Sequence, residues 1–288
     1  MKKNLLTILL FAASMTPSAA QQAQQSRIDV LMGVDFNYRD IHWKKIYEVL
    51  VNLTPGVRWQ FGNHWQVAGQ ALIPVYNDYG DYYKHPRLNV ASLSKDIRLG
   101  RHLLKASGGL FSHERYGLDV KWMLPVTSWL AFDAQMGYTG YISMAGKWEY
   151  SSIDRLTGWV GSRVWLNPWQ TEFRVRGGRY IYEDYGVSGE CYRHFTHCSV
   201  GVYGQYSNKS DANGGFKIIV MLPPYSRKHR IVNIRPASNF RLTNNIEADA
   251  YSMQMYQTDP EENERQNWFG RDLLQWGVNT MSPDFTEH

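Results

Sequence analysis

The chain has 288 residues and a formal net charge of +5 at pH 7, and 14% of its residues are aromatic, among them 19 Tyr and 11 Trp. The basic residues are spread without a long run, which gives little support to nucleic-acid binding. No segment beyond the N-terminal region offers the roughly 18 consecutive apolar residues that a transmembrane helix needs. A membrane-spanning form of this protein would therefore have to cross as strands.

The N-terminal region has the order of a secretory signal peptide. Lys2 and Lys3 precede a short apolar stretch at 5–13, and small residues at Ser18 and Ala20 suit cleavage directly afterwards. We therefore expect residues 1–20 to be a signal peptide. No Cys follows the cleavage site, which disfavours a lipoprotein anchor.

Alternation of apolar and polar residues begins soon after this leader. Residues 28–38 place Ile, Val, Met, Val, Phe and Tyr at every second position, and segments 47–61 and 65–75 repeat the pattern. A short turn at 62–64 joins the last two segments, and a longer loop follows at 77–84. Short turns that alternate with longer loops are typical of outer-membrane barrels.

The same alternation predicts nine further strands, at 87–99, 103–112, 115–124, 129–144, 155–166, 172–182, 192–206, 215–222 and 237–250. We therefore expect an all-β fold in which residues 21–256 form a single antiparallel transmembrane β-barrel of about twelve strands. An even number of strands would leave both chain ends on the periplasmic side. A secreted β-sandwich is the alternative, because its half-buried strands also alternate.

Several charged residues occur at positions whose parity matches the polar face of a strand. A cationic side chain on the lipid face at mid-bilayer would cost ~2–4 kcal/mol, so we expect these residues to point into the lumen. There they could line an aqueous path selective for anionic sugars, or pair with one another and fill the lumen. The predicted lumen-lining residues are Arg58, Asp119, Lys121, Asp133, Arg174, Arg176, Arg241, Glu247 and Asp249.

The alternation stops after Ala250. The run from Asp259 through Pro260 to Glu262 has the features of a helix start with a proline in its first turn. We expect residues 257–288 to be a tail that is either poorly ordered or contains a short amphipathic helix on the membrane surface.

Two cysteines, Cys191 and Cys198, occur close together in the second half of the chain. In one straight strand they would lie too far apart for a disulfide, so a bridge requires a turn between them, and an oxidising compartment favours that bridge. His194 and His197 add ligand types suited to zinc, but the spacing matches no established finger pattern. We expect neither a metal nor a cofactor.

Outer-membrane phospholipases use a Ser–His pair on a barrel of about this size. The nearest candidates here are Ser112 with His113 and Glu114, and His194 with Ser199. Neither set shows an evident third orienting group or an oxyanion donor in the sequence. We therefore expect a protein that is not an enzyme.

Gly/aromatic motifs mark the region 103–241: Ala106-Ser107-Gly108-Gly109-Leu110-Phe111-Ser112, Gly178-Arg179-Tyr180, Val200-Gly201-Val202-Tyr203-Gly204, Gly214-Gly215-Phe216-Lys217 and Leu222-Pro223-Pro224. Through these motifs the region 103–241 resembles the YjbH-type family of outer-membrane proteins, which are encoded with exopolysaccharide production systems. The chain is much shorter than the long family members and lacks the Gly-Leu-Ile and Pro-Thr-Ala type opening of many of them. The resemblance implies participation in exopolysaccharide secretion or surface assembly, and it assigns no catalytic residues.

Together these features predict a monomeric, non-enzymatic barrel of the bacterial outer membrane that takes part in exopolysaccharide export or cell-surface assembly. Its expected partners are outer-membrane lipid, the polysaccharide and export proteins. A general diffusion channel is the second interpretation, and an outer-membrane lipid hydrolase is the third.

Overall fold

The computed structural model describes residues 27–39, 48–144, 148–195, 198–209, 212–221, 227–228, 232–237, 239–245 and 253–262. Over these ranges the chain is all-β, with two short 3-10 helices, η1 (Asp81–Lys84) and η2 (Asn167–Trp169), between strands. None of the helices in these ranges is long and apolar enough to cross a membrane. The predicted signal peptide lies outside the described residues.

All the described strands belong to one sheet. Most of it is an antiparallel meander in which each strand pairs with the next one along the chain. The strands are β1 (Arg27–Met32), β2 (Val34–Arg39), β3 (Glu48–Leu53), β4 (Gly56–Phe61), β5 (Trp65–Asn77), β6 (Arg87–Leu99), β7 (His102–Phe111), β8 (Arg115–Pro125), β9 (Leu130–Ser143), β10 (Glu149–Tyr150), β11 (Arg155–Leu166), β12 (Thr171–Arg179), β13 (Tyr185–His194), β14 (Cys198–Ser207), β15 (Ala212–Met221), β16 (Arg227–Lys228), β17 (Val232–Pro236) and β18 (Asn239–Asn245).

Three pairs of consecutive strands, β1 with β2, β3 with β4 and β17 with β18, each form one long pass across the sheet with a short interruption. β1 pairs with β4 and β2 pairs with β3 in one continuous register, and the break at Gly33 is bridged by a hydrogen bond from the Thr54 N–H to the Gly33 carbonyl (2.8 Å). β3 and β4 separate at Pro55, which has no N–H to donate to the ladder. β17 and β18 separate around Ala237. With these pairs joined and the two-residue strands β10 and β16 set aside, the described part of the chain makes thirteen long passes.

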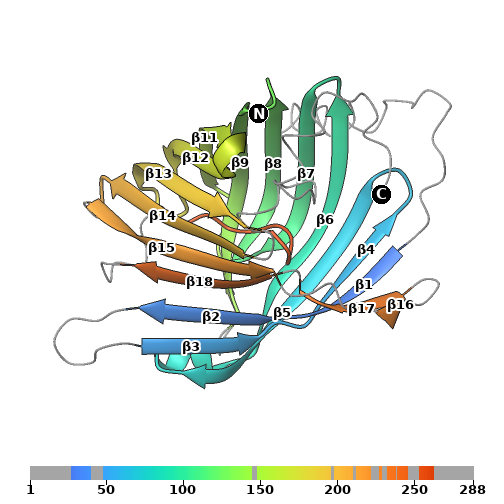
Figure 1. Cartoon of the computed structure of the whole chain (residues 1–288). Helices are drawn as coiled ribbons and strands as arrows, with labels where there is room; N and C mark the ends of the chain where they lie inside the picture. The colour runs from blue at the N-terminus through green and yellow to red at the C-terminus, as the bar shows by residue number, and fades with distance from the viewer. Residues whose placement is uncertain are drawn as a thin grey trace.

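The first and last passes lie next to each other and run in the same direction. β1 and β17 form a parallel ladder from Ile28 opposite Val232 to Met32 opposite Pro236, and β18 lies beside β2 (Figure 1). An odd number of antiparallel passes gives the first and the last the same direction, which explains this pairing. The sheet is therefore mixed.

These observations confirm the predicted all-β class and correct its details. The described residues form one large mixed sheet, not the purely antiparallel, twelve-stranded barrel that the alternation predicted. The predicted strand at 192–206 is two strands, β13 and β14. Alternation alone does not reveal the turn, because the inward Tyr192 has the same parity as the outward Val200 and Val202.

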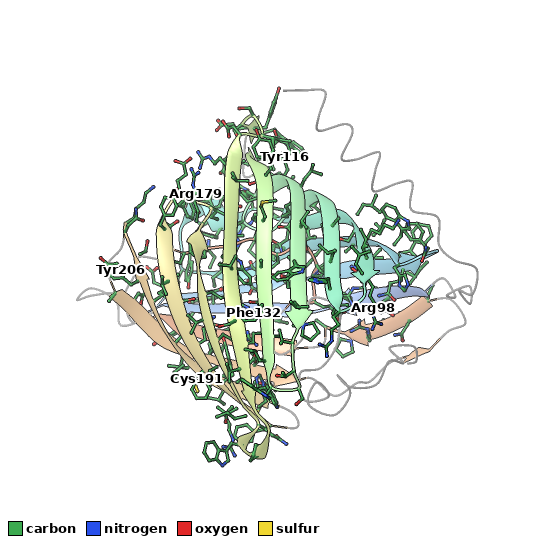
Figure 2. The ribbon with its side chains drawn as sticks, turned by 90° about the horizontal axis from the view of Figure 1, so that it is seen from above. Arg98, Tyr116, Phe132, Arg179, Cys191 and Tyr206 are labelled. Atoms are coloured by element: carbon green, nitrogen blue, oxygen red, sulfur yellow. The ribbon has the colours of Figure 1, made fainter. Side chains whose placement is uncertain are left out.

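The two faces of the sheet differ sharply in polarity. On β9 the side chains of Phe132 and Met136 are 41% and 59% exposed, whereas those of Asp133 and Gln135 are 1% and 4% exposed. Other strands show the same pattern, so apolar side chains cover the outer face and polar ones the enclosed inner face (Figure 2). This arrangement is the reverse of a water-soluble protein, in which buried polar residues are the exception.

Exposed aromatic residues gather towards the two ends of the strands. Trp129 and Trp169 lie at the end where most connections are short, apart from the one between β15 and β17. Tyr82 and Tyr150 lie at the opposite end, which carries the long connections that follow β2, β5 and β9. We call these the short-turn end and the long-loop end.

Candidate functional site on the inner face

Residues 253–262, which we call the inner strap, cross the inner face of the sheet. At the long-loop end the Met253 N–H donates to Asp184 Oδ2 (2.6 Å), and at the other end Glu261 reaches Arg235 on β17. Figure 1 shows this segment, drawn in red, in the interior of the curled sheet. Residues 258–261 form turns, whereas the sequence predicted a helix start at this point. The helix predicted beyond residue 262 lies outside the described residues.

Packing holds the first half of the inner strap. The Tyr256 ring stacks on Phe111 of β7, with centroids 5.0 Å apart, and its hydroxyl donates to Asp119 Oδ2 (2.9 Å). Gly137 on β9 makes room for it, because a Cβ there would lie 1.5 Å from the Tyr256 hydroxyl oxygen. Burial and the neighbouring Asp119 carboxylate raise the pKa of Tyr256 far above its ordinary value, which keeps the proton on the donor.

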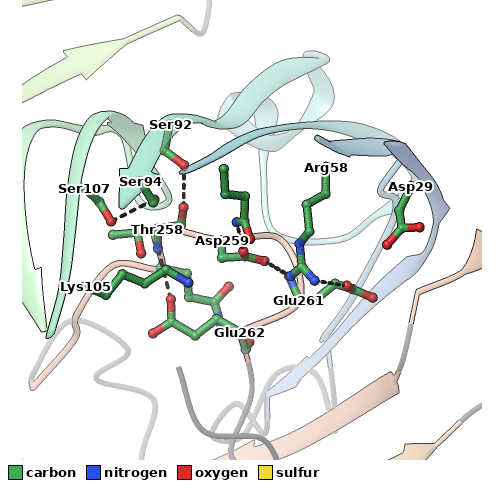
Figure 3. Close-up of polar contacts among 12 residues, drawn as sticks. Asp29, Arg58, Ser92, Ser94, Lys105, Ser107, Thr258, Asp259, Glu261 and Glu262 are labelled. Atoms are coloured by element: carbon green, nitrogen blue, oxygen red, sulfur yellow. Dashed lines mark hydrogen bonds and ion pairs between the residues drawn. The ribbon is translucent and has the colours of Figure 1, made fainter. Parts of the chain in front are cut away.

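Ion pairs hold the second half. Arg58 on β4 contacts both Asp259 and Glu261, the latter through Nη1 at 2.7 Å (Figure 3). Arg235 binds the two carboxylate oxygens of Glu261 at 2.5 and 2.6 Å. Bidentate arginine contacts of this kind are among the stronger charged hydrogen bonds in proteins.

Lys121 on β8 provides a third cationic contact. Its Nζ lies 2.6 Å from each carboxylate oxygen of Glu262 and donates to Thr258 Oγ1 at 2.9 Å. Ser92 on β6 donates to the Thr258 carbonyl at 2.6 Å. The second half of the inner strap is therefore fixed by charged and polar groups from several different strands.

The electrostatics of Asp259 follow from these contacts. Burial alone would raise its pKa, but the charges of Arg58 and Lys105, with hydrogen bonds from the Glu261 N–H and Arg58, hold the pKa of Asp259 well below its usual range. The carboxylate is therefore ionised at neutral pH.

A second charged group, which we call the arginine cluster, lies on β9, β11, β12, β13 and β15. Arg174 binds both carboxylate oxygens of Glu172 at 2.7 Å, and Arg163 Nε donates to Asp133 Oδ2 at 2.5 Å. Arg176 lies 3.5 Å from the same Asp133 oxygen, so that carboxylate serves two guanidinium groups. Lys217 and Glu190, 3.0 Å apart, extend the cluster. Such reciprocal pairing is what makes buried charge tolerable inside a protein.

The predicted Ser–His pair at Ser199 gains a third member in the structure. His194 Nδ1 lies 2.8 Å from Ser199 Oγ, and His194 Nε2 lies 3.0 Å from Glu172 Oε2. The pairing of β12 with β13 brings Glu172 to the histidine, which the sequence could not show. A serine, histidine and carboxylate in this order can activate the serine hydroxyl as a nucleophile. Here, however, Ser199 and Glu172 are at most 1% exposed, and the Glu172 carboxylate is also bound by Arg174.

The other Ser–His pair has a structural role. Ser112 Oγ lies 3.1 Å from His113 Nδ1 and accepts the N–H of Gln257 at 2.7 Å, while the Ser112 N–H donates to the Gln257 carbonyl. These contacts tie the inner strap to the end of β7.

The disulfide that the sequence favoured is not formed. Cys191 on β13 faces Val202 on β14, four residues from Cys198, which corresponds to about 13 Å along the strand. A disulfide needs a Cα separation below about 7 Å. His197 lies outside the described residues, and in the part of the chain that is described no group of three or more His, Cys, Asp or Glu residues could hold a metal ion.

Most of the predicted lumen-lining residues lie on the inner face, in two separate groups. Arg58, Asp119 and Lys121 contact the inner strap, and Asp133, Arg174 and Arg176 belong to the arginine cluster. The backbone of Arg241 pairs with Ile219, and Glu247 and Asp249 lie outside the described residues. Arg163, Glu172, Arg235 and the strap carboxylates also lie on the inner face and were not among the predicted residues. Glu172 shares the parity of Arg174 and could have been found by that signal.

Comparison of the chain with protein-family models, with curated proteins and with solved structures finds no match. Its function must therefore be inferred from its own residues and geometry.

The ion pairs of Asp259 predict a pH-dependent stability. Because its folded pKa is depressed, its contribution is complete above the ordinary pKa of about 3.8 and is lost as the pH falls below that value. We expect Asp259→Asn to destabilise the protein by about 3 kcal/mol at pH 7, since it leaves Arg58 short of a buried partner. The difference from the wild type should shrink steadily below about pH 4.

Urea unfolding at several pH values measures this effect. Asp81→Asn, at an exposed aspartate paired with Lys84, is the matched control and should unfold like the wild type at neutral pH. Equal stability of Asp259→Asn and the wild type at pH 7 would contradict the described anchoring of the inner strap.

Proposed function

We propose that this protein spans the bacterial outer membrane as a β-barrel. The observation that carries the proposal is the polarity of the sheet, with Phe132, Met136, Val160 and Val175 exposed outside and ionised groups enclosed inside. In water that outer face would be an extended apolar surface, which soluble monomers rarely expose. In a lipid bilayer the same face is satisfied, and the backbone groups are paired within the sheet.

The parallel ladder between β1 and β17 supports closure of the sheet into a barrel. Membrane barrels cannot leave a strand edge facing lipid, because its N–H and C=O groups would have no partners. Pairing of the first pass with the last removes that edge. We propose that the barrel closes along the pairing of β1 with β17 and, further along the same passes, of β2 with β18, which lie side by side.

The ends of the strands support an orientation. Bacterial outer-membrane barrels have short periplasmic turns, longer outer loops and aromatic residues at both interfaces. We therefore propose that the short-turn end, with Trp129 and Trp169, faces the periplasm, and that the long-loop end, with Tyr82 and Tyr150, faces the cell exterior.

Within this membrane frame we propose a non-enzymatic role in exopolysaccharide export or cell-surface assembly. The support for this role is the resemblance of residues 103–241 to the YjbH-type family. The inner strap favours it over a general diffusion channel, because it occupies the interior that small solutes would have to cross.

A lipid hydrolase is the second candidate, favoured by one observation: the contacts of His194 with Ser199 and Glu172. It ranks lower because a nucleophile must meet its substrate, and Ser199 is enclosed on the inner face, away from the apolar outer surface that would face lipid.

The membrane proposal predicts that the folded protein requires detergent for solubility and migrates differently on a gel before and after heating. In planar bilayers it should insert without steady conductance, because the inner strap crosses the interior and is tied to several strands there. Heat-denatured protein is the control. Migration unaffected by heat together with solubility in plain buffer would contradict the barrel, and a large steady conductance would favour the diffusion channel instead.

The functional role is tested by deleting the gene and restoring it. We expect deletion to reduce surface polysaccharide without changing the uptake of small solutes, and we expect the Ser199→Ala protein to restore the polysaccharide as fully as the wild type. Full production in the deletion strain would refute the export role. Rescue by the wild type but not by Ser199→Ala, at equal protein levels, would favour the hydrolase.

A further inference from the structure

The C-terminal end of the inner strap carries several acidic residues, and their carboxylates form ion pairs with cationic residues of the sheet. Glu261 contacts Arg58 and Arg235, and Glu262 contacts Lys121, so carboxylates of the strap face three cations from three different strands. These cations come from segments far apart in the sequence, and the strap is what they share. Arg235 also lies 3.2 Å from Asp29 on β1, but without the strap Arg58, Lys121 and Arg235 would each lose the carboxylates of Asp259, Glu261 or Glu262.

Groups suited to sugar hydroxyls lie beside these cations. Ser94 and Ser107 lie 2.9 Å apart through their hydroxyl oxygens, Ser92 donates to the Thr258 carbonyl, and the Gln66 amide contacts Asp259 (Figure 3). Hydroxyl and amide side chains can both donate and accept hydrogen bonds. Cations next to such groups form a surface that matches a carboxylated sugar better than a neutral one.

The acidic end of the strap is a turn that holds its own shape. Its turn is closed by its own hydrogen bonds, from the Glu261 N–H to Asp259 Oδ1 (2.9 Å), from the Thr258 N–H to Glu262 Oε2 (3.1 Å) and from Gln257 Nε2 to the Glu262 carbonyl (3.0 Å). The apolar contacts of the strap lie elsewhere, around Tyr256. The tip is therefore held to the sheet by polar contacts that another carboxylate could replace one for one.

We propose that Arg58, Lys121 and Arg235 form a binding site for a carboxylate-bearing polysaccharide, and that the acidic tip of the inner strap occupies this site until the polymer displaces it. The proposal rests on the proposed export function and names its substrate class. Exchange of one set of carboxylates for another keeps the buried cations paired, so displacement avoids the large penalty of an isolated buried charge. A neutral polymer offers no such exchange.

Binding of oligogalacturonate to the full-length protein in detergent tests the site, with a maltooligosaccharide of equal length as the neutral probe. Neutralising the tip with Asp259→Asn, Glu261→Gln and Glu262→Gln should tighten oligogalacturonate binding by about tenfold or more, because the competing carboxylates are removed. Adding Arg58→Gln should abolish that gain. The matched control neutralises three acids elsewhere, with Asp81→Asn, Glu149→Gln and Glu183→Gln, and should bind like the wild type.

A labelling experiment keeps the strap intact and covers the case in which the neutralised protein does not fold. In a Cys191→Ser, Cys198→Ser background, a thiol introduced by Thr258→Cys is shielded, since Thr258 is 1% exposed. Oligogalacturonate should accelerate its reaction with a water-soluble maleimide by about tenfold, and the neutral oligosaccharide should not.

The inference is overturned if oligogalacturonate changes neither binding nor labelling, or if the neutral probe acts equally well. Heat-modifiable migration, measured on the same samples, separates the two proposals. Protein that migrates as a folded barrel yet ignores the acidic sugar refutes the binding site alone, whereas protein that shows no such migration refutes the membrane function.

Discussion

The structure depends on the pairing of ionised side chains within the enclosed face of the sheet. Arg174 with Glu172 and Arg163 with Asp133 are buried, and the strap carboxylates and their cations are buried or half-buried. A buried charge without a partner costs several kcal/mol, roughly the whole stability of a small domain. This reciprocal pairing is what allows the polar residues to occupy the interior and leaves the apolar residues for the outer face.

The inner strap follows from the topology. Thirteen passes end at the opposite end of the sheet from where they began, so a chain that leaves β18 is at the long-loop end. Residues 253–262 then cross back along the inner face to Arg58 and Arg235. One segment thus returns the chain to the short-turn end, completes the ion pairs of the sheet and occupies the interior.

Local patterns predicted much of the fold and part of the site. The period of two located most strands and placed Asp119, Lys121, Asp133 and Arg174 on the inner face. Successive side chains of a strand point to opposite faces, so the parity of each position along the strand decides its face. What the sequence could not show depended on contacts distant along the chain. The parallel ladder of β1 with β17 spans some 200 residues, and the partners of Arg58 lie as far away. The acidic run after residue 258 has the local features of a helix start, and nothing local indicates that it folds into the interior.

The central claim is that the outer face meets lipid while the inner face does not, and two adjacent residues of β9 test it most directly. Nitroxide labels placed singly at Met136, on the outer face, and at Gln135, on the inner face, can be compared in lipid vesicles for accessibility to oxygen and to a water-soluble nickel complex. The account predicts that the label at 136 is accessible to oxygen and shielded from nickel, and that the label at 135 lacks this lipid signature. Strong nickel accessibility at 136 would show that the apolar face lies in water and would contradict the account.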